Sequence, residues 1–249
     1  MAHCFLEIWM SKVSECNPLI QQYLQRSGLQ LQQELDEHDI ARDVQWLEHF
    51  LDEAVRPSVR WQYPVPELGE GGACSLFGEL AAEPYDLALT LGGKKADTEH
   101  ALQQLQLFCQ AFEQRTGLEW FGIYQARLKP QPVLVKLAYY GEPSRAEFPL
   151  NEVFALSSNN SSVGLSGQAR VINDVPAYLA SGGQYYSCDP KVQAEACLPL
   201  FDHSGKIVGI IDAEAFNKDV FNAATLTLLV AICLMVPAYL PAAVQPCSD

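Results

Sequence analysis

Residues 184–216 read QYYSCDPKVQAEACLPLFDHSGKIVGIIDAEAF, and this stretch contains most of the candidate site residues. Two apolar runs separated by the turn sequence DHSG predict a β-hairpin. Side chains alternate between the two faces of a strand, so Asp212 and Glu214 are predicted to project to the same side. Glu195 lies in the first apolar run, and Cys188 lies in the polar loop before it. A hairpin that presents one thiol and three carboxylates among apolar residues is not typical of a generic core.

The chain from residue 97 onward alternates helical and extended patterns. The predicted elements are a helix at 97–117, strands at 118–128 and 132–140, an extended piece at 145–156, a polar segment at 157–167, a short strand at 170–173, a loop at 176–187, the hairpin, and a terminal helix from about Asp219 to Pro237. A helix, a strand pair, a hairpin and a final helix predict an α+β fold built on a central antiparallel sheet flanked by helices.

The first 95 residues have a different character. Residues 1–55 carry apolar side chains at helical spacing, with a break suggested at Gly28 and an end at Pro57. Residues 56–95 are rich in Pro and Gly and predict at most short strands around 61–65 and 85–91. We therefore expect an N-terminal helical extension and irregular linker at 1–95, a main domain at 96–240 and a C-terminal tail at 241–249.

The overall composition excludes several classes of function. Lys and Arg number 16 against 30 Asp and Glu, a formal net charge of −14, and no basic run offsets this charge, so nucleic-acid binding is not expected. The eight cysteines are scattered without a CxxC pair, and the N-terminus lacks a basic signal start, which predicts reduced thiols and a cytoplasmic protein. No spacing of His, Cys and Asp predicts a metal site, and no nucleotide-binding fingerprint occurs.

One apolar segment requires a membrane test. Residues 220–248 contain no charged side chain, but Pro237 and Pro241 interrupt the run, so its helical part is shorter than the roughly 20 residues that a span requires. The pattern favours a buried or dimer-forming terminal helix over a tail anchor, and we expect no membrane insertion and a homodimer.

The order of these motifs resembles a GAF domain. The segments that carry the resemblance are LEWFGIYQ, VGLSGQARVINDV, YYSCD and EACLPLFDHSGKIVGIIDAEAF, followed by an apolar helix. GAF domains are ligand-binding folds related to PAS domains, with a central antiparallel sheet between helices. The resemblance covers about residues 97–240 and implies that fold, with residues 1–95 outside it.

Within this superfamily the chain is most similar to the free methionine-(R)-sulfoxide reductases. The matching positions are Trp120 and Tyr124 in the W-x-G-x-Y strand, Cys188 before Asp, Glu195 before an apolar-Pro-apolar step, and Asp212 with Glu214 in place of Asp-x-Asp. The resemblance implies that the ligand is a free amino acid, which Trp120, Tyr124, Asp212 and Glu214 bind. It also implies that Cys188 and Glu195 are catalytic, and that the enzyme uses no cofactor but an external thiol reductant such as thioredoxin.

The chain departs from this family at the recycling thiols. Residues 162–167 read SVGLSG where the family has a G-V-C-G turn, and Arg145 lies roughly where another cysteine is expected. Cys197 is the nearest second thiol in sequence and is a candidate resolving thiol. These departures affect the redox cycle more than the pocket.

Each candidate residue also has a structural interpretation. Trp120 and Tyr124, with Gly122 leaving a gap between them, are either ordinary core aromatics or a slot for a thioether group. The acids Asp212 and Glu214 either lie at a solvent edge or meet a cationic ligand.

Glu195 and Cys188 also each have a functional and a structural interpretation. Glu195 is either a proton donor with a raised pKa or a salt-bridge partner on the outer face of the sheet. A loop cysteine such as Cys188 is either inert or a nucleophile, and nearby acids would raise its pKa.

The sequence leaves three functional hypotheses. The first is a reductase of free L-methionine-(R)-sulfoxide that uses Cys188 as its nucleophile. The second is a non-catalytic GAF sensor or binding module for an amino acid or related metabolite, with a signalling or dimerisation role. The third is a scaffold whose pocket is filled by its own side chains.

Overall fold

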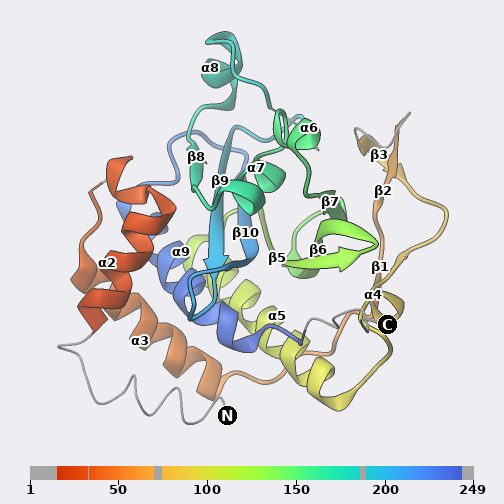
Figure 1. The fold of residues 1–249 in the computed structure, drawn as a ribbon, viewed down its shortest axis with the longest axis horizontal. Helices are drawn as coiled ribbons and strands as arrows, with labels where there is room; N and C mark the ends of the chain where they lie inside the picture. The colour runs from red at the N-terminus through yellow and green to blue at the C-terminus, as the bar shows by residue number, and fades with distance from the viewer. Residues whose placement is uncertain (1–15, 33, 70–74, 186–188, 243–249) are drawn as a thin grey trace.

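A six-stranded antiparallel sheet forms the centre of the molecule (Figure 1). In this computed structural model the described residues are 16–32, 34–69, 75–185 and 189–242. The strands lie in the order β7-β6-β5-β10-β9-β8. Their bounds are β5 Trp120–Lys129, β6 Gln131–Tyr140, β7 Glu147–Pro149, β8 Arg170–Ile172, β9 Ala194–Phe201 and β10 Ile207–Ala215.

The predicted hairpin is confirmed as β9 and β10. Asp202 closes its turn by accepting hydrogen bonds at one carboxylate oxygen from the backbone N–H groups of Ser204 (2.9 Å) and Lys206 (3.0 Å). Gly205 has φ +84°, a conformation that glycine adopts without steric strain. Because β10 pairs with β5 on its other side, the hairpin lies in the middle of the sheet and not at its edge.

Helices α5 (Ala96–Thr116) and α9 (Ala223–Met235) cover one face of the sheet, where most of the hydrophobic core lies. The rings of Phe112 on α5 and Phe121 on β5 stack with centroids 4.6 Å apart. Helix α9 continues into the 3₁₀ turn η3 (Val236–Tyr239), and its residues Leu226–Cys233 are buried inside the chain. The terminal apolar run is therefore a core helix, and the homodimer stays a prediction.

The N-terminal helices pack into the same core. They are α2 (Cys16–Ser27), the 3₁₀ turn η1 (Leu29–Leu31) and α3 (Glu37–Glu53), and Gly28 separates the first two with φ +72°, as its sequence position suggested. Thr227 of α9 donates to buried Asp43 of α3 over 2.9 Å, and the Tyr23 hydroxyl donates to the Pro199 carbonyl of β9 over 3.0 Å. Helical structure within residues 1–55 is thus confirmed for 16–27, 29–31 and 37–53, and the domain division at residue 95 stays a prediction.

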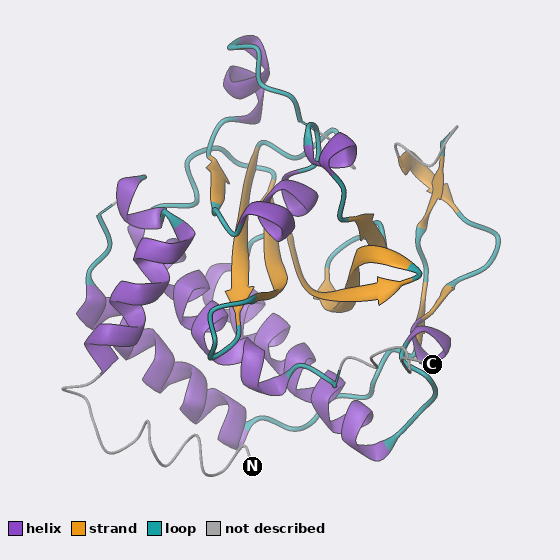
Figure 2. Cartoon of the chain, viewed as in Figure 1, coloured by secondary structure: helices purple, strands orange, loops and turns teal. Residues whose placement is uncertain are grey.

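The linker between α3 and α5 forms two small antiparallel pairs (Figure 2). Strand β1 (Gln62–Tyr63) pairs with β4 (Tyr85–Asp86), and β2 (Pro66–Leu68) pairs with β3 (Ser75–Leu80), before the short helix α4 (Leu87–Thr90). The short strand expected near 61–65 is found as β1, and it pairs with β4. The strand expected near 85–91 is only Tyr85–Asp86, because Leu87–Thr90 form a helix. Buried Tyr63 donates its hydroxyl to the Lys136 carbonyl of β6 over 2.8 Å, so the linker is tied to the central sheet.

The second face of the sheet is covered by α6 (Glu152–Ala155) and α7 (Asn159–Ser166), and α8 (Val175–Ala180) projects beyond it (Figure 1). Three expectations are corrected here. The polar segment 157–167 forms a capped helix, the loop expected at 176–187 begins with a helix, and the extended piece at 145–156 contains only the three-residue strand β7. Asn151, Ser158 and Asp174 accept the capping hydrogen bonds of α6, α7 and α8, although the same residue types are also typical of loops.

Across the described ranges, no helix is both long and apolar enough to cross a membrane.

Candidate functional site

Strand alternation and register bring the sequence-predicted site residues to one face of the sheet. Glu214 on β10 lies directly opposite Trp120 on β5 and directly opposite Glu195 on β9. Two residues along, Asp212 lies opposite Gly122 on one side and Cys197 on the other. Three carboxyl groups therefore share the face that α7 covers. Asp212 and Glu214 do not lie at a solvent edge of the sheet, and Glu195 does not form a salt bridge on its outer face.

The first turn of α7 closes over the acids. Ser158 caps the helix by accepting from the Ser161 N–H over 3.2 Å, so the helix begins with its polar residues directed into the interior. Asn159 and Asn160 are 3% and 5% exposed, values that place both carboxamides inside the molecule. The first turn of α7 thus supplies two amides to the site.

Asn160 connects a carboxyl group to a thiol. Its Nδ2 donates to Asp212 Oδ2 over 3.0 Å, and its Oδ1 accepts from Cys197 Sγ over 3.3 Å. Cys197 is fully buried, and burial, together with the charges of Asp212 and Glu195, raises the pKa of its thiol well above the ordinary value. At neutral pH Cys197 is therefore a protonated thiol held in a hydrogen bond.

Burial shifts the pKa of all three carboxyl groups upward. Burial raises the pKa of Glu195, and the hydrogen bond from the Tyr185 hydroxyl partly offsets this increase. Burial, and then the charges of Glu195 and Glu214, raise the pKa of Asp212 well above its ordinary value. Burial and the charge of Glu195 raise the pKa of half-buried Glu214 to about 8. Burial therefore favours the protonated form of each carboxyl group, and an ionised member of the cluster would attract a cation.

Two polar groups at this site make no hydrogen bond of ordinary geometry to the described residues, although both lie close enough to Glu195 to lower its pKa. They are Asp212 Oδ1 and both ends of the Asn159 carboxamide. Both residues are more than nine-tenths buried, and an unsatisfied buried polar group costs about 1–3 kcal/mol. A polar ligand placed between α7 and the acids would satisfy them.

The aromatic wall beside the acids is fixed in place. Trp120 donates its indole N–H to the Glu142 carbonyl over 3.1 Å, and the Tyr124 hydroxyl donates to the Arg145 carbonyl over 3.3 Å. The expected gap at Gly122 is filled, because a Cβ on that residue would lie 2.4 Å from the Trp120 ring. The two rings lie with centroids 6.5 Å apart, so Trp120 folds over the glycine and presents its face next to Tyr124.

A buried cation also reaches this face. Lys136 of β6 is fully buried, and its Nζ lies 4.0 Å from the ring centroid of Tyr139 and 5.1 Å from that of Tyr63. The charge of Lys136 lowers the pKa of Glu214, in opposition to burial. The site therefore contains both signs of charge.

The described residues on either side of Cys188 lie at the acids. Tyr185 forms a hydrogen bond with Glu195, and the charge of Asp189 contributes to the raised pKa of Glu214. Cys188 itself lies outside the described residues, so its role as the nucleophile stays a prediction.

Sequence reasoning missed five of the residues that form this site. They are Lys136, Asn159, Asn160, Tyr185 and Arg170, whose charge lowers the pKa of Glu195. A lysine within the apolar run VLVKLAYY was a readable signal. The asparagines gave no signal, since their pattern is equally typical of a loop or a cap.

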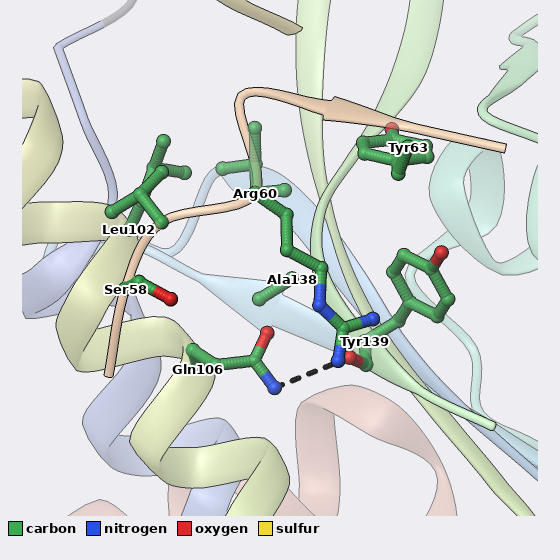
Figure 3. A pocket seen from close by; sticks show the side chains of 9 residues that line it. Ser58, Arg60, Tyr63, Leu102, Gln106, Ala138 and Tyr139 are labelled. Carbon is green, nitrogen blue, oxygen red and sulfur yellow. Dashed lines mark hydrogen bonds between the residues drawn. The ribbon is translucent and has the colours of Figure 1, made fainter. Parts of the chain in front are cut away.

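A small cavity lies between the linker and α5, beside residues 137–139 of β6 (Figure 3). Its volume of about 10 Å³ accommodates no more than a single water molecule. Gln106 and Arg60 point toward Tyr139 there, and Gln106 donates to the Tyr139 carbonyl over 3.2 Å. The cavity is a packing feature that supports Tyr139.

In the described part of the chain, no group of three or more His, Cys, Asp or Glu side chains is placed to hold a metal ion. The chemistry of the site comes from carboxyl, carboxamide, phenol, indole and ammonium groups.

Comparison with solved structures finds several chains that are similar to this one. The GAF domain from a phosphoenolpyruvate-protein phosphotransferase of Coxiella burnetii matches with a TM-score of 0.50 at 10% identity, over 81% of this chain and 92% of that one. The type II free methionine-R-sulfoxide reductase from Thermoplasma acidophilum matches with a TM-score of 0.49 at 25% identity, over 57% of this chain and 94% of that one. The free methionine-R-sulfoxide reductase from Neisseria meningitidis matches with a TM-score of 0.45 at 19% identity, over 59% of this chain and 80% of that one.

No curated protein matches the chain. The GAF domain family model matches residues 100–237, which is more than half of the chain. This span contains the whole six-stranded sheet together with α7 and α9. The chain belongs to the GAF domain family.

Proposed function

We propose that this protein reduces free L-methionine-(R)-sulfoxide with Cys188 as its nucleophile. The observation that carries the proposal is the juxtaposition of Glu195, Asp212 and Glu214 with the wall of Trp120 and Tyr124 on one buried face. The acids suit an ammonium group, and the aromatic wall suits the methyl-sulfoxide end of the same ligand. The sequence resemblance to the free methionine-(R)-sulfoxide reductases supports the same assignment.

The proposed chemistry transfers the sulfoxide oxygen to the cysteine. The Cys188 thiolate attacks the sulfoxide sulfur, while Glu195 delivers a proton to the oxygen. Burial raises the pKa of Glu195, which favours the protonated form that this step requires. This attack forms an S–S bond that places the protonated oxygen beside the cysteine sulfur. The substrate S–O bond then breaks as the hydroxyl group passes to that sulfur, the S–S bond breaks, and methionine leaves with Cys188 as a sulfenic acid. The substrate sulfur is reduced by two electrons, and the cysteine sulfur is oxidised by the same number.

An external thiol then restores the enzyme in this scheme. It condenses with the sulfenic acid to give a mixed disulfide and water, and a second thiol returns Cys188 to its reduced form. The alternative, resolution by Cys197, has less support, because Cys197 is buried, protonated and hydrogen-bonded to Asn160. A small dithiol such as dithiothreitol, or thioredoxin, would serve as reductant.

Steady-state release of methionine from free L-methionine-(R)-sulfoxide under dithiothreitol tests the proposal. We expect Glu195→Gln to lower turnover by about 10²–10⁴-fold, the usual range for loss of a general acid. Glu83→Gln, at an exposed position of the linker, is the matched control and should keep wild-type turnover. Undiminished turnover in Glu195→Gln would remove the proton-transfer step from the scheme.

A second candidate function is a GAF binding module for an amino acid. The observation that favours it is that Cys109, Cys197 and Cys233 are all buried. None of these three thiols is therefore exposed to serve as the second thiol of a redox cycle. A ligand-dependent rise in melting temperature without any methionine release would favour this candidate.

A further inference from the structure

A lysine reaches the site face through an irregularity in β6. The pairing of β5 with β6 shifts between Ile123, which lies opposite Ala138, and Tyr124, which lies opposite Lys136. Leu137 is the extra residue, and a bulge of this kind redirects the side chains that follow it. Without the shift, Lys136 and Tyr139 would lie on opposite faces; with it, both lie on the face of the acids.

The environment of Lys136 is unusually specific for an ammonium group. Its Nζ donates to the Ser144 carbonyl over 2.8 Å and to the Ser144 hydroxyl over 2.7 Å. Tyr63, Trp120 and Tyr139 surround it, with ring centroids 5.1, 5.8 and 4.0 Å from Nζ. Burying a charged group is unfavourable unless partners compensate it, and an unbranched apolar side chain would occupy the same space without that penalty. The charge itself therefore requires an explanation.

The lysine complements the acids across the site. Its charge acts on Glu214, which lies opposite Trp120, and Trp120 is also one wall of the lysine's surroundings. An acidic cluster alone would accept any amine. An acidic cluster with a cation on its aromatic side fits a ligand that carries an ammonium and a carboxylate on the same carbon.

We propose that Lys136 is a specificity-determining residue that selects ligands with a carboxylate next to the ammonium group, that is, free α-amino acids over simple amines. This inference rests on the proposed function, because it concerns the ligand of the same site. Ser144 would hold the ammonium group of Lys136 in position, while the acids bind the ligand's own ammonium group.

Two probes that differ only in the carboxylate test the inference. Calorimetric titration would compare L-methionine-(R)-sulfoxide with 3-(methylsulfinyl)propan-1-amine, which lacks that group, at one pH. We expect the wild-type protein to bind the amino acid at least about tenfold more tightly. In Lys136→Met the ratio should fall to within about twofold, through weaker binding of the amino acid and unchanged binding of the amine. Lys129→Met, which removes a half-exposed lysine paired with Glu147, should keep the wild-type ratio.

The outcomes separate this inference from the proposed function. Wild-type protein that binds neither probe contradicts the proposed function itself. Equal wild-type affinity for both probes overturns the role of Lys136 and leaves the proposed function standing. A Lys136→Met variant that keeps the full preference also overturns it. If that variant fails to fold, Lys136→Gln, which keeps a hydrogen-bond donor but no charge, takes its place with the same expected loss of preference.

Discussion

Glu214 on β10 and Glu195 on β9 are direct cross-strand partners, and both face the interior side of α7. Two carboxylates directly opposite each other repel when both are ionised. Burial and the charge of Glu195 accordingly raise the pKa of Glu214 to about 8. The pair therefore binds protons more tightly in the folded state than in the unfolded state, where the pKa of a glutamate is 4.5.

This pair predicts a protein that loses stability as the pH rises. A raised pKa in the folded state contributes stability that is complete below about pH 4.5 and is lost as the pH rises through about 8. Glu214→Gln removes this contribution because glutamine does not titrate. We expect the fall in unfolding free energy between pH 5 and 8.5 to be smaller in the variant by on the order of 2 kcal/mol. Urea denaturation across this range checks it, with Glu83→Gln as the exposed control; an identical pH slope in Glu214→Gln would contradict the assignment.

Ligand affinity should increase as the pH rises, whereas the stability of the protein falls. An ammonium group requires an ionised carboxylate, so binding below pH 8 must displace a proton from the cluster. We expect affinity for L-methionine-(R)-sulfoxide to increase between pH 6 and 8 by up to about tenfold per pH unit, and to level off above pH 8. Calorimetry in two buffers of different ionisation enthalpy measures the proton release directly. Affinity that is constant or falls over this range would rule out recognition of the ammonium group by these acids.

The contact between Trp120 and Gly122 predicts a non-additive pair of substitutions. Gly122→Ala should destabilise the protein by about 1–3 kcal/mol, because the new Cβ would overlap the Trp120 ring at the Cη2 atom. Trp120→Phe removes that atom and should lower the penalty of Gly122→Ala by about 1 kcal/mol or more in the double variant. Urea denaturation of the four proteins completes the cycle. Additive effects would mean that the indole does not lie over the glycine.

Cys197 should be unreactive in the folded protein. It is fully buried, its thiol donates to Asn160, and burial raises its pKa well above the ordinary value. We expect alkylation of Cys197 to be at least about 10³-fold slower in the native state than in urea, as measured by peptide mass spectrometry. Rapid native labelling would instead support its predicted role as the resolving thiol.

The elements that follow a simple periodicity could be predicted from the sequence. The hairpin, the helix after residue 96 and the terminal helix were all anticipated, because their apolar spacing matches the period of a strand or a helix. Strand alternation was also sufficient to place Asp212 and Glu214 on one face. The register with β9 and β5 then added Glu195 and Trp120 to that face.

The rest of the site depends on features that periodicity does not encode. Lys136 reaches the site only because of the bulge at Leu137, and no sequence pattern fixes the position of a bulge. Asn159 and Asn160 lie in a polar segment whose composition suits a loop as well as the capped helix that forms. Trp120 fills the space above Gly122 through its side-chain rotamer, which depends on packing and not on spacing.

A single-turnover experiment tests whether Cys188 is the nucleophile that reduces the sulfoxide. Pre-reduced protein, freed of reductant, would be mixed with excess L-methionine-(R)-sulfoxide, and the methionine released per chain would be counted. We predict about one equivalent from the wild-type protein and none from Cys188→Ser, since each sulfoxide reduced converts one thiolate to a sulfenic acid. The same variant should still bind the sulfoxide by calorimetry. Equal release from Cys188→Ser, or binding without any release from the wild-type protein, would contradict the reductase and leave a GAF domain that only binds its ligand.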